Sequence, residues 1–394
     1  MKARFSFLKT IMLGSLAFSF ASYAEVQRPI IEKYAKHAQY LDIKISPEGT
    51  YLASTSRSED GLISLTILDI KKQEVVSITR GRGKESVSTF NWLNDDRLLL
   101  TMAREVGSFE QPMPTGELIA MNADGSDSTI LTGWRSESGD KRFSQIVDYL
   151  PSEPDAVVVY SVDLTAKEPY LDLYKMKVSN GRKSAMGRMP LRRYAGSGAG
   201  VITGSNGNVL AMYNADPNED NKQTLIVRSS PESEWYTAYE AGAYDPFFQP
   251  LVFLADNKTL VGLSTIETDT RAIATFNVDT KKHTVLYAHD KVDVSPILHI
   301  QNGQVREVQG ASFEYLGIDA VFLDGTQYVE EQKVLASLTN TFKGQLVEQT
   351  SSTNDTNQVI FRVGNANNPT VFTYLINPHE SWLNLLKLSL GLKI

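Results

Sequence analysis

Ser46-Pro47-Glu48-Gly49, followed by the apolar run Tyr51-Leu52-Ala53, decides the fold because this pair of signals recurs along most of the chain. Each copy is a polar, turn-forming cluster that precedes an apolar strand. The copies begin about 50 residues apart, with one wider gap, at Ser46, Asn94, Pro151, Ser205, Asp256 and Thr353. A second turn signal follows each copy after roughly 25 residues, at 69–72, 122–125, 179–181, 229–232, 278–281 and 377–379.

A period near 50 residues that contains two hairpins is typical of a four-stranded propeller blade. Each blade buries its faces only against its neighbours, so such units pack in series. The expected fold class is therefore an all-β propeller. Six blades are predicted to begin near Leu41, Ser88, Phe143, Val201, Pro250 and Gln345.

The gap between the last two blades leaves room for a seventh. In residues 294–328, a predicted hairpin turns at 301–304 and a further strand covers 318–323. We therefore expect a seven-bladed propeller, with six blades as the alternative. Long loops at 103–116, 215–222 and 265–271 are expected to lie on one rim.

Two segments depart from the strand pattern. Residues 30–37 have apolar side chains near helical spacing, which predicts a short helix in a lead-in segment at 25–40. Residues 328–342 show a similar spacing among charged side chains, which predicts a helix inserted before the last blade. The propeller itself is expected to span 41–394.

The first 24 residues have the features of a secretory signal peptide. Lys2, Arg4 and Lys9 precede an apolar stretch at 11–20, and Ser22-Tyr23-Ala24 places small residues where signal peptidase cleaves. An uncleaved anchor is the alternative. No later segment approaches 18 consecutive apolar residues, so no membrane span is expected after cleavage.

Composition restricts the partners. The chain has no cysteine, which an exported protein with a large β-core does not need. The net charge of −7 becomes −10 once the three basic residues of the signal segment are removed. Such a surface does not suit nucleic acid, since phosphate binding needs clustered Lys and Arg. We expect a periplasmic protein, with secretion as the alternative.

Motifs that could carry chemistry are incomplete. Residues 216–220 open like a calcium loop, but Asn221 replaces the turn glycine and Val227 the bidentate glutamate. Residues 196–200 are glycine-rich, without the lysine of a phosphate loop or a G-x-S-x-G nucleophile, and fit a connector better.

Two other groups of residues have side chains that could act as ligands. The basic residues Arg188, Arg192 and Arg193 could hold a carboxylate or simply be solvated. Surface or packing roles are expected for the five histidines, which are His37, His283, His289, His299 and His379. The sequence therefore assigns no catalytic, cofactor-binding or metal-binding residue, and no cofactor is expected.

The order of these signals resembles the propeller region of bacterial prolyl-oligopeptidase-family serine peptidases. The resemblance rests on 46–53, on 90–99, on 116–125 and on the helical insert before 350–361, and it extends over most of 41–388. In that family the propeller restricts access to a C-terminal α/β-hydrolase domain, so that peptides reach the catalytic serine. This chain stops at Ile394 without a G-x-S-x-G motif, so no member of the catalytic triad can be carried over.

The resemblance implies a non-catalytic propeller that is similar to a substrate-gating domain, in a truncated or split form, with peptides as ligands. The alternative is an independent periplasmic propeller that binds a protein or cell-wall partner. A propeller enzyme with paired carboxylates on its channel rim is the third possibility. The oligomeric state is left open by the sequence.

Overall fold

The computed structural model describes residues 40–376 and 383–384, apart from 108–109, 137–138, 140, 151, 164, 166–169, 193–199, 217–218 and 366–367. The predicted signal segment, the predicted helix at 30–37 and the final residues 385–394 lie outside the described residues. Within the described ranges, no helix is long and apolar enough to cross a membrane.

The first three sheets each contain four consecutive antiparallel strands. Sheet A comprises β1 (Tyr40–Ile45), β2 (Tyr51–Arg57), β3 (Ile63–Asp69) and β4 (Glu74–Thr79). Sheet B comprises β5 (Glu85–Trp92), β6 (Arg97–Arg104), β7 (Met113–Asn122) and β8 (Thr129–Thr132). Sheet C comprises β9 (Phe143–Asp148), β10 (Ala156–Val162), β11 (Tyr170–Lys177) and β12 (Lys183–Arg192).

The next two sheets repeat this meander. Sheet D comprises β13 (Gly200–Thr203), β14 (Val209–Asp216), β15 (Lys222–Val227) and β16 (Tyr236–Ala241). Sheet E comprises β17 (Phe248–Phe253), β18 (Thr259–Ser264), β19 (Ala272–Asn277) and β20 (His283–Tyr287).

The last part of the chain differs. Sheet F has three strands, β21 (Ser295–Gln301), β22 (Gln304–Glu314) and β23 (Ile318–Phe322), and helix α3 (Val329–Thr341) follows it. Sheet G comprises β24 (Leu346–Ser352), β25 (Val359–Asn365), β26 (Asn368–Ile376) and β27 (Leu383–Asn384). The helical insert predicted at 328–342 is confirmed by α3.

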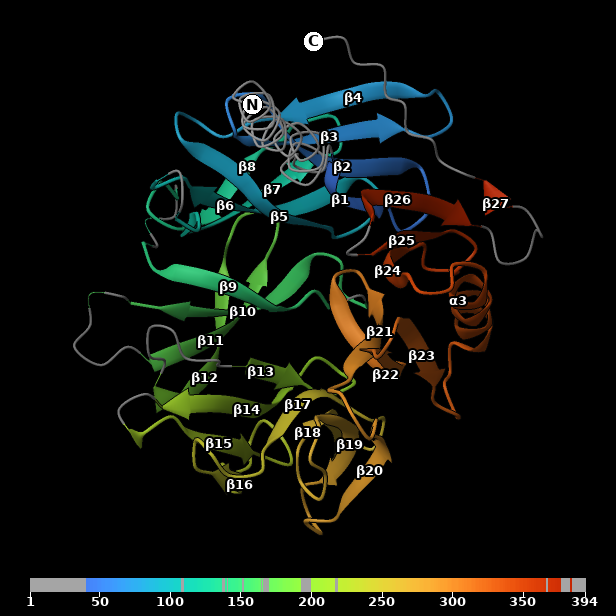
Figure 1. Cartoon of the computed structure of the whole chain (residues 1–394). Coiled ribbons are helices and arrows are strands. Elements are labelled where there is room, and N and C mark those ends of the chain that lie inside the picture. Colours follow the sequence, from blue (N-terminus) through green and yellow to red (C-terminus); the bar gives the residue numbers. More distant parts are fainter. Residues whose placement is uncertain are drawn as a thin grey trace, which may run out of the picture.

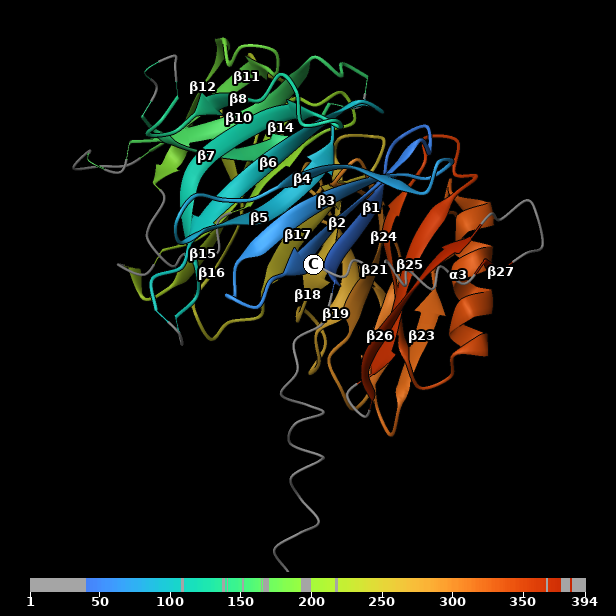
Figure 2. The same ribbon diagram turned by 90° about the horizontal axis from the view of Figure 1, so that it is seen from above.

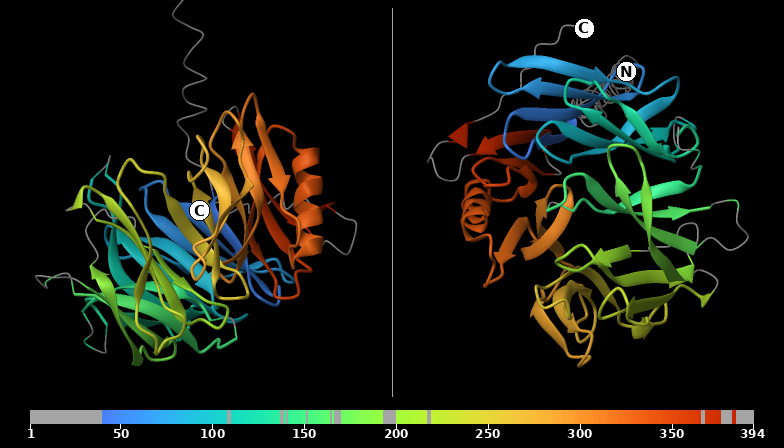
Figure 3. Two further views of the ribbon diagram at one scale, coloured as in Figure 1. Left: turned by 90° about the horizontal axis from the view of Figure 1, so that it is seen from below. Right: turned by 180° about the vertical axis from the view of Figure 1, so that it is seen from behind.

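The sheets follow one another around a ring in sequence order, with the first sheet (blue) beside the last (red) (Figure 1). The same circular order is visible from behind (Figure 3). Helix α3 lies on the outer side, next to the strands of sheets F and G (Figure 2). A β-propeller with six four-stranded blades therefore confirms the six predicted repeats. The region predicted as a seventh blade forms a sheet of three strands instead of four.

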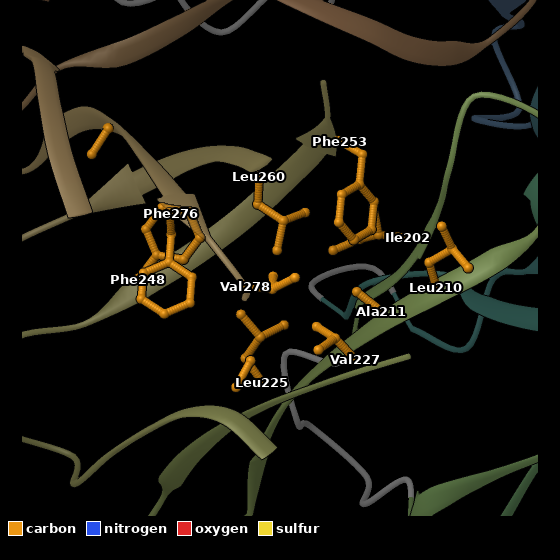
Figure 4. Close-up of a cluster of buried hydrophobic side chains, with 12 residues drawn as sticks. Ile202, Leu210, Ala211, Leu225, Val227, Phe248, Phe253, Leu260, Phe276 and Val278 are labelled. Atoms are coloured by element: carbon orange, nitrogen blue, oxygen red, sulfur yellow. The ribbon is translucent and has the colours of Figure 1, made fainter. Parts of the chain in front are cut away.

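Each interface between neighbouring sheets has its own apolar cluster. Between sheets D and E, Leu225 and Val227 face Phe248, Leu260 and Phe276 (Figure 4). Similar clusters join A to B, B to C, C to D, E to F, F to G and G to A. Burial is thus shared between sheets and not confined within any one of them, as the repeat pattern predicts.

The strand order defines two rims. We name the edge of the ring where each first strand ends the Ser46 rim, after the turn at 46–50. The opposite edge, where the first strands begin, is the Tyr40 rim. The long connections at 105–112, 217–221 and 265–271 each join a second strand to a third, so they all belong to the Tyr40 rim. The loop predicted at 103–116 is shorter than expected, because β6 and β7 extend into it at both ends.

Candidate functional site

The first strands of neighbouring sheets contact one another around the middle of the ring, as β1 and β21 both do with β24. Every first strand also shows a register shift against its second strand. A β-bulge bends a strand and redirects its side chains. The ends of the first strands at the Ser46 rim are therefore where polar groups can be aimed across the channel.

A chain of polar contacts joins sheets A, B and C at this rim. The Lys44 Nζ donates to the Asn91 Oδ1 at 2.8 Å and to the Phe90 carbonyl at 2.7 Å. The Asn91 Nδ2 in turn donates to the Tyr149 hydroxyl at 2.6 Å. Burial raises the pKa of Tyr149 to about 12, although the hydrogen bond from Asn91 lowers it. Tyr149 is therefore a neutral structural group at physiological pH.

The β21–β22 hairpin of sheet F reaches across the middle of the ring at the same rim. At its tip, Gly303 lies against the side chain of Asn91 in sheet B. Three residues after Gly303, Arg306 reaches Asp148 of sheet C. Its two terminal nitrogens lie 3.1 and 3.4 Å from the two carboxylate oxygens. In Figure 1 this hairpin (orange) lies toward the middle of the ring, near β9 and β24. We name residues 301–306 the channel hairpin.

Asp148 is fully buried and has further donors. The Thr203 hydroxyl of sheet D donates to it at 2.5 Å, and the Leu150 amide donates at 2.9 Å. A buried carboxylate is stable only when it is paired and hydrogen-bonded. The ion pair with Arg306 therefore fixes the channel hairpin across the ring to sheets C and D.

A groove of about 380 Å³ runs along the first strands of sheets F and G. Its walls come from β21 and β24, with Ser312 and Arg362 at its side, and they include Ile297, Leu298, Gln349 and Thr350. A small cavity near Lys44 and Asn91 shares Ile300 and Thr350 with the groove. The groove thus leads from the Tyr40 rim toward the channel hairpin.

Behind the groove, helix α3 inserts a buried carboxylate between the sheets. The Glu331 Oε1 lies 2.7 Å from the His299 Nδ1 and accepts from the Gln309 Nε2 at 3.3 Å. The Glu331 Oε2 accepts from the Gln349 Nε2 at 3.3 Å. The His299 ring also stacks on Tyr328, with centroids 3.5 Å apart. These contacts join α3 to both sheets and connect it to the groove wall.

Two other polar clusters have no accessible reactive group. Ser144 and Ser161 share a 2.7 Å hydrogen bond, and the Lys183 Nζ lies 2.7 Å from the Ser161 Oγ, but both serines are buried. A Ser–Lys arrangement can activate a nucleophile only where a substrate reaches it. This cluster is therefore a packing feature of sheet C.

At the Tyr40 rim, Arg135 holds two buried carboxylates. Its guanidinium binds Glu117 through two nitrogens and Glu85 at 2.8 Å, and Arg104 lies 3.3 Å from Glu85. These hydrogen bonds, the one to Glu117 first, raise the pKa of Arg135. The two acids are thus paired with arginine and are not poised as a general acid and base.

The candidate arginines, histidines and glycine-rich segment from the sequence do not form a common site in the described residues. Arg188 binds Asp172, with its Nε 2.6 Å from the carboxylate, whereas Arg193 and 196–199 lie outside the described residues. His283 contacts Ser264 and His289 packs on Phe313, while His37 and His379 also fall outside the description. In the described ranges, no three His, Asp or Glu side chains are grouped so that they could hold a metal ion.

The sequence predicts the turn at 301–304 but not the sheet against which it packs. It does not indicate the ion pair between Arg306 and Asp148. Their separation of 158 residues places them in different repeats. The sequence pattern marks Glu331 only as one of the charged residues of the predicted helix. A single acidic residue on the apolar side of a predicted helix is the signal that could have identified it.

No protein-family model matches this sequence, and no curated protein matches it significantly. Solved structures do match its fold. A prolyl endopeptidase aligns with a TM-score of 0.53 and 10% identity over 96% of this chain and 55% of its own. A puromycin hydrolase variant complexed with PGG aligns with a TM-score of 0.50 and 8% identity, over 90% of this chain and 54% of its own.

The propeller domain of the Trilobed protease from Pyrococcus furiosus, which has an open velcro topology, aligns with a TM-score of 0.50 and 9% identity, over 89% of this chain and 97% of its own. The chain thus spans about half the length of two of these structures and nearly all of the third. At such low identities the likeness concerns the fold. This chain is a β-propeller similar to the propeller domains of peptidases of the prolyl-oligopeptidase type.

Proposed function

We propose that this chain is a non-catalytic propeller that binds peptides within its channel, in the manner of a substrate-gating domain. The observation that carries the proposal is the groove along β21 and β24, which leads toward the crossing channel hairpin. An extended peptide fits such a passage, whereas a folded protein does not. The sequence resemblance and the peptidase propellers with similar folds support the same ligand class.

The test is equilibrium dialysis of the purified chain against pools of tripeptides and pentapeptides and against a small folded protein. We expect saturable binding of peptides and none of the folded protein. Absence of binding at about 1 mM peptide, where even weak complexes form, would contradict the proposal. Hydrolysis of peptide nitroanilides that persists through purification would contradict its non-catalytic part.

We also infer that sheet F is the seventh blade. It lies between sheets E and G, and it contacts β17 and β24. Helix α3 packs beside β23 at the outer edge of this sheet, where the other blades have a fourth strand. An experimental structure in which sheet F leaves the ring would refute this inference.

The proposed location is the periplasm, which rests on residues 1–24 of the sequence. N-terminal sequencing of the protein recovered from a periplasmic fraction should begin at Glu25. A chain that retains Met1 or Lys2 in the cytoplasmic or membrane fraction would contradict the cleavage.

A second candidate function, binding of a periplasmic protein, is favoured by the tight turn between β22 and β23. Leu316 there is 98% exposed, and its φ of 59° is uncommon for a non-glycine residue. An apolar side chain so presented suits a partner surface. Crosslinking with periplasmic extract should give a defined adduct that Leu316→Asp removes, and an unchanged adduct would argue against this candidate.

A further inference from the structure

The groove has two unpaired strand edges. β21 is hydrogen-bonded only to β22, and β24 only to β25, so each strand leaves its other edge without a ladder. No hydrogen bond joins β21 to β24 in the described part of the chain. The edge of β24 is instead tied to sheet A near its end, where the Ile45 amide donates to the Ser351 hydroxyl at 2.8 Å. Unpaired edges of this kind accept an extended peptide.

Gln349 supplies a buried acceptor in the groove wall. The residue is 7% exposed, and its Nε2 faces Glu331. Its Oε1 is buried and has no partner among the described residues. The nitrogen and oxygen of an amide diverge, so this oxygen points away from Glu331. The Gln349 oxygen is covered, so Gln349 forms part of the groove wall and its oxygen is not a contact point for a ligand.

Glu331 determines the orientation of the Gln349 side-chain amide. Because a carboxylate only accepts hydrogen bonds, it selects the nitrogen of Gln349 and turns the oxygen away. The other carboxylate oxygen is occupied by His299 and Gln309. Helix α3 thus fixes the orientation of the Gln349 amide behind the groove.

A charge lies at the side of the same groove. Arg362 on β25 is exposed, lines the groove and stands opposite Glu348 of β24 in the strand register. Neither side chain forms an ion pair with a described residue. A guanidinium without a partner can bind a carboxylate through two parallel hydrogen bonds. The volume of about 380 Å³ is near the lower end of ligand pockets, which suits a short peptide.

We propose that the groove between β21 and β24 binds a short extended peptide with a free C-terminal carboxylate. Arg362 binds the carboxylate, and the free edge of β21 forms hydrogen bonds with the backbone of the peptide. This assignment rests on the proposed function, since it names the ligand class and the site within the channel. It predicts that the peptide terminus, more than any particular side chain, determines recognition.

The test compares acetylated tripeptide pools that end in a free acid or in an amide. Binding to the full chain is measured by equilibrium dialysis with mass spectrometry, for the wild type, Arg362→Gln and the control Arg82→Gln. Arg82 is an exposed arginine in the turn between β4 and β5, and it does not line the groove. Hydrogen exchange of β21 is followed with and without the best-bound peptide.

We expect the wild type and Arg82→Gln to bind the acids about tenfold more tightly than the amides, as one lost charge-assisted contact implies. Arg362→Gln should remove this difference, and bound peptide should slow exchange in β21. If acids and amides bind equally and Arg362→Gln has no effect, the groove assignment is wrong but peptide binding by the propeller still holds. If no tripeptide or pentapeptide binds, the channel function is overturned with it.

Discussion

At Gly303, the channel hairpin has no space for a side-chain atom. Its φ is +75°, and a Cβ added there would lie 2.5 Å from the Asn91 Cγ and Oδ1. Asn91 cannot easily move away, because Lys44 and Tyr149 hold its amide on both sides. Glycine is therefore required here for two reasons, the backbone conformation and the close approach.

Gly303→Ala should destabilise the fold by about 1–3 kcal/mol more than Gly61→Ala, as overpacking usually does. Gly61 is a matched control, since its φ is +86° and no atom lies within 4 Å of an added Cβ. Both substitutions strain the backbone, but only the Cβ added in Gly303→Ala collides with Asn91. Urea unfolding of both variants measures the difference, and equal midpoints would show that the hairpin tip is not packed against sheet B.

Tyr149 gives a prediction about alkaline pH. Its pKa is raised from 10.0 to about 12 by burial, so the folded state favours the neutral phenol. The stabilisation is complete below pH 10 and is lost as pH rises toward 12. Tyr149→Phe removes this titration, but it also leaves the Asn91 amide without an acceptor.

The variant should therefore be about 1 kcal/mol less stable than wild type at pH 9, which is typical for one lost hydrogen bond. By pH 11 the wild type should have lost about 1.4 kcal/mol through Tyr149, so the gap should close. Urea midpoints at the two pH values test this. A gap that stays constant would mean that Tyr149 titrates normally.

At the scale of elements, helix α3 depends on one carboxylate. Glu331 accepts three hydrogen bonds from His299, Gln309 and Gln349. Glu331→Gln places an amide nitrogen against at least one of these donors. We expect a loss of about 2–3 kcal/mol, in the range of hydrogen bonds to buried charged groups.

Glu330→Gln is the control on the same turn. Glu330 is 59% exposed and forms an ion pair with Lys333. Substitutions at exposed positions usually change stability by less than about 0.5 kcal/mol. Thermal or urea unfolding separates the two variants. A similar small effect of both would show that the Glu331 cluster does not hold α3 to the sheets.

The strands were predictable because their turns are local. Ser46-Pro47-Glu48-Gly49 and Asn122-Ala123-Asp124-Gly125 close within four residues, and the Gly125 amide bonds back to the Asn122 carbonyl at 2.9 Å. The helix at Val329–Thr341 was also indicated by local spacing. These elements arise from contacts within one repeat, which a sequence pattern records.

The candidate site was not predictable because it arises between repeats. A register shift at each first strand changes which side chains face the middle of the ring, and it leaves no fixed mark in the alternation of residues. Arg306 and Asp148 look like ordinary surface charges in their own strands. Only the ring brings them together, so their pairing required the three-dimensional structure.

At the scale of the whole molecule, the channel hairpin couples opposite sides of the ring. Arg306→Gln would leave Asp148 buried with only Thr203 and the Leu150 amide as donors. Removal of one partner from a buried ion pair is costly, so we expect a loss of about 2–4 kcal/mol. The hairpin should also be released, with faster hydrogen exchange at 301–306.

Arg82→Gln again serves as the control, and it should change neither stability nor exchange. The exchange measurement matters more than the stability, because it reports on the hairpin itself. Unchanged protection at 301–306 in Arg306→Gln would show that packing, and not the ion pair, keeps the hairpin across the channel.

The ring closes between sheets G and A without an exchanged strand in the described residues, since every sheet there consists of consecutive strands. The junction relies on one apolar cluster, with Ile360 packed against Ile43 and Ile45. Two hydroxyl contacts support it, the Thr350 Oγ1 donating to the Ile43 carbonyl at 2.9 Å and the Ser351 Oγ accepting from the Ile45 amide at 2.8 Å. A junction of this kind should open before the blades unfold.

The double variant Thr350→Val, Ser351→Ala should therefore weaken this junction by about 2 kcal/mol, roughly 1 kcal/mol for each lost hydrogen bond. Hydrogen exchange at the Ile45 amide should rise about 30-fold at low urea, while that of β15 in the middle of the chain stays unchanged. Thr341→Val, which removes an exposed hydroxyl bond within α3, is the control. If β1 and β15 respond equally, the ring has no weak junction and opens only by global unfolding.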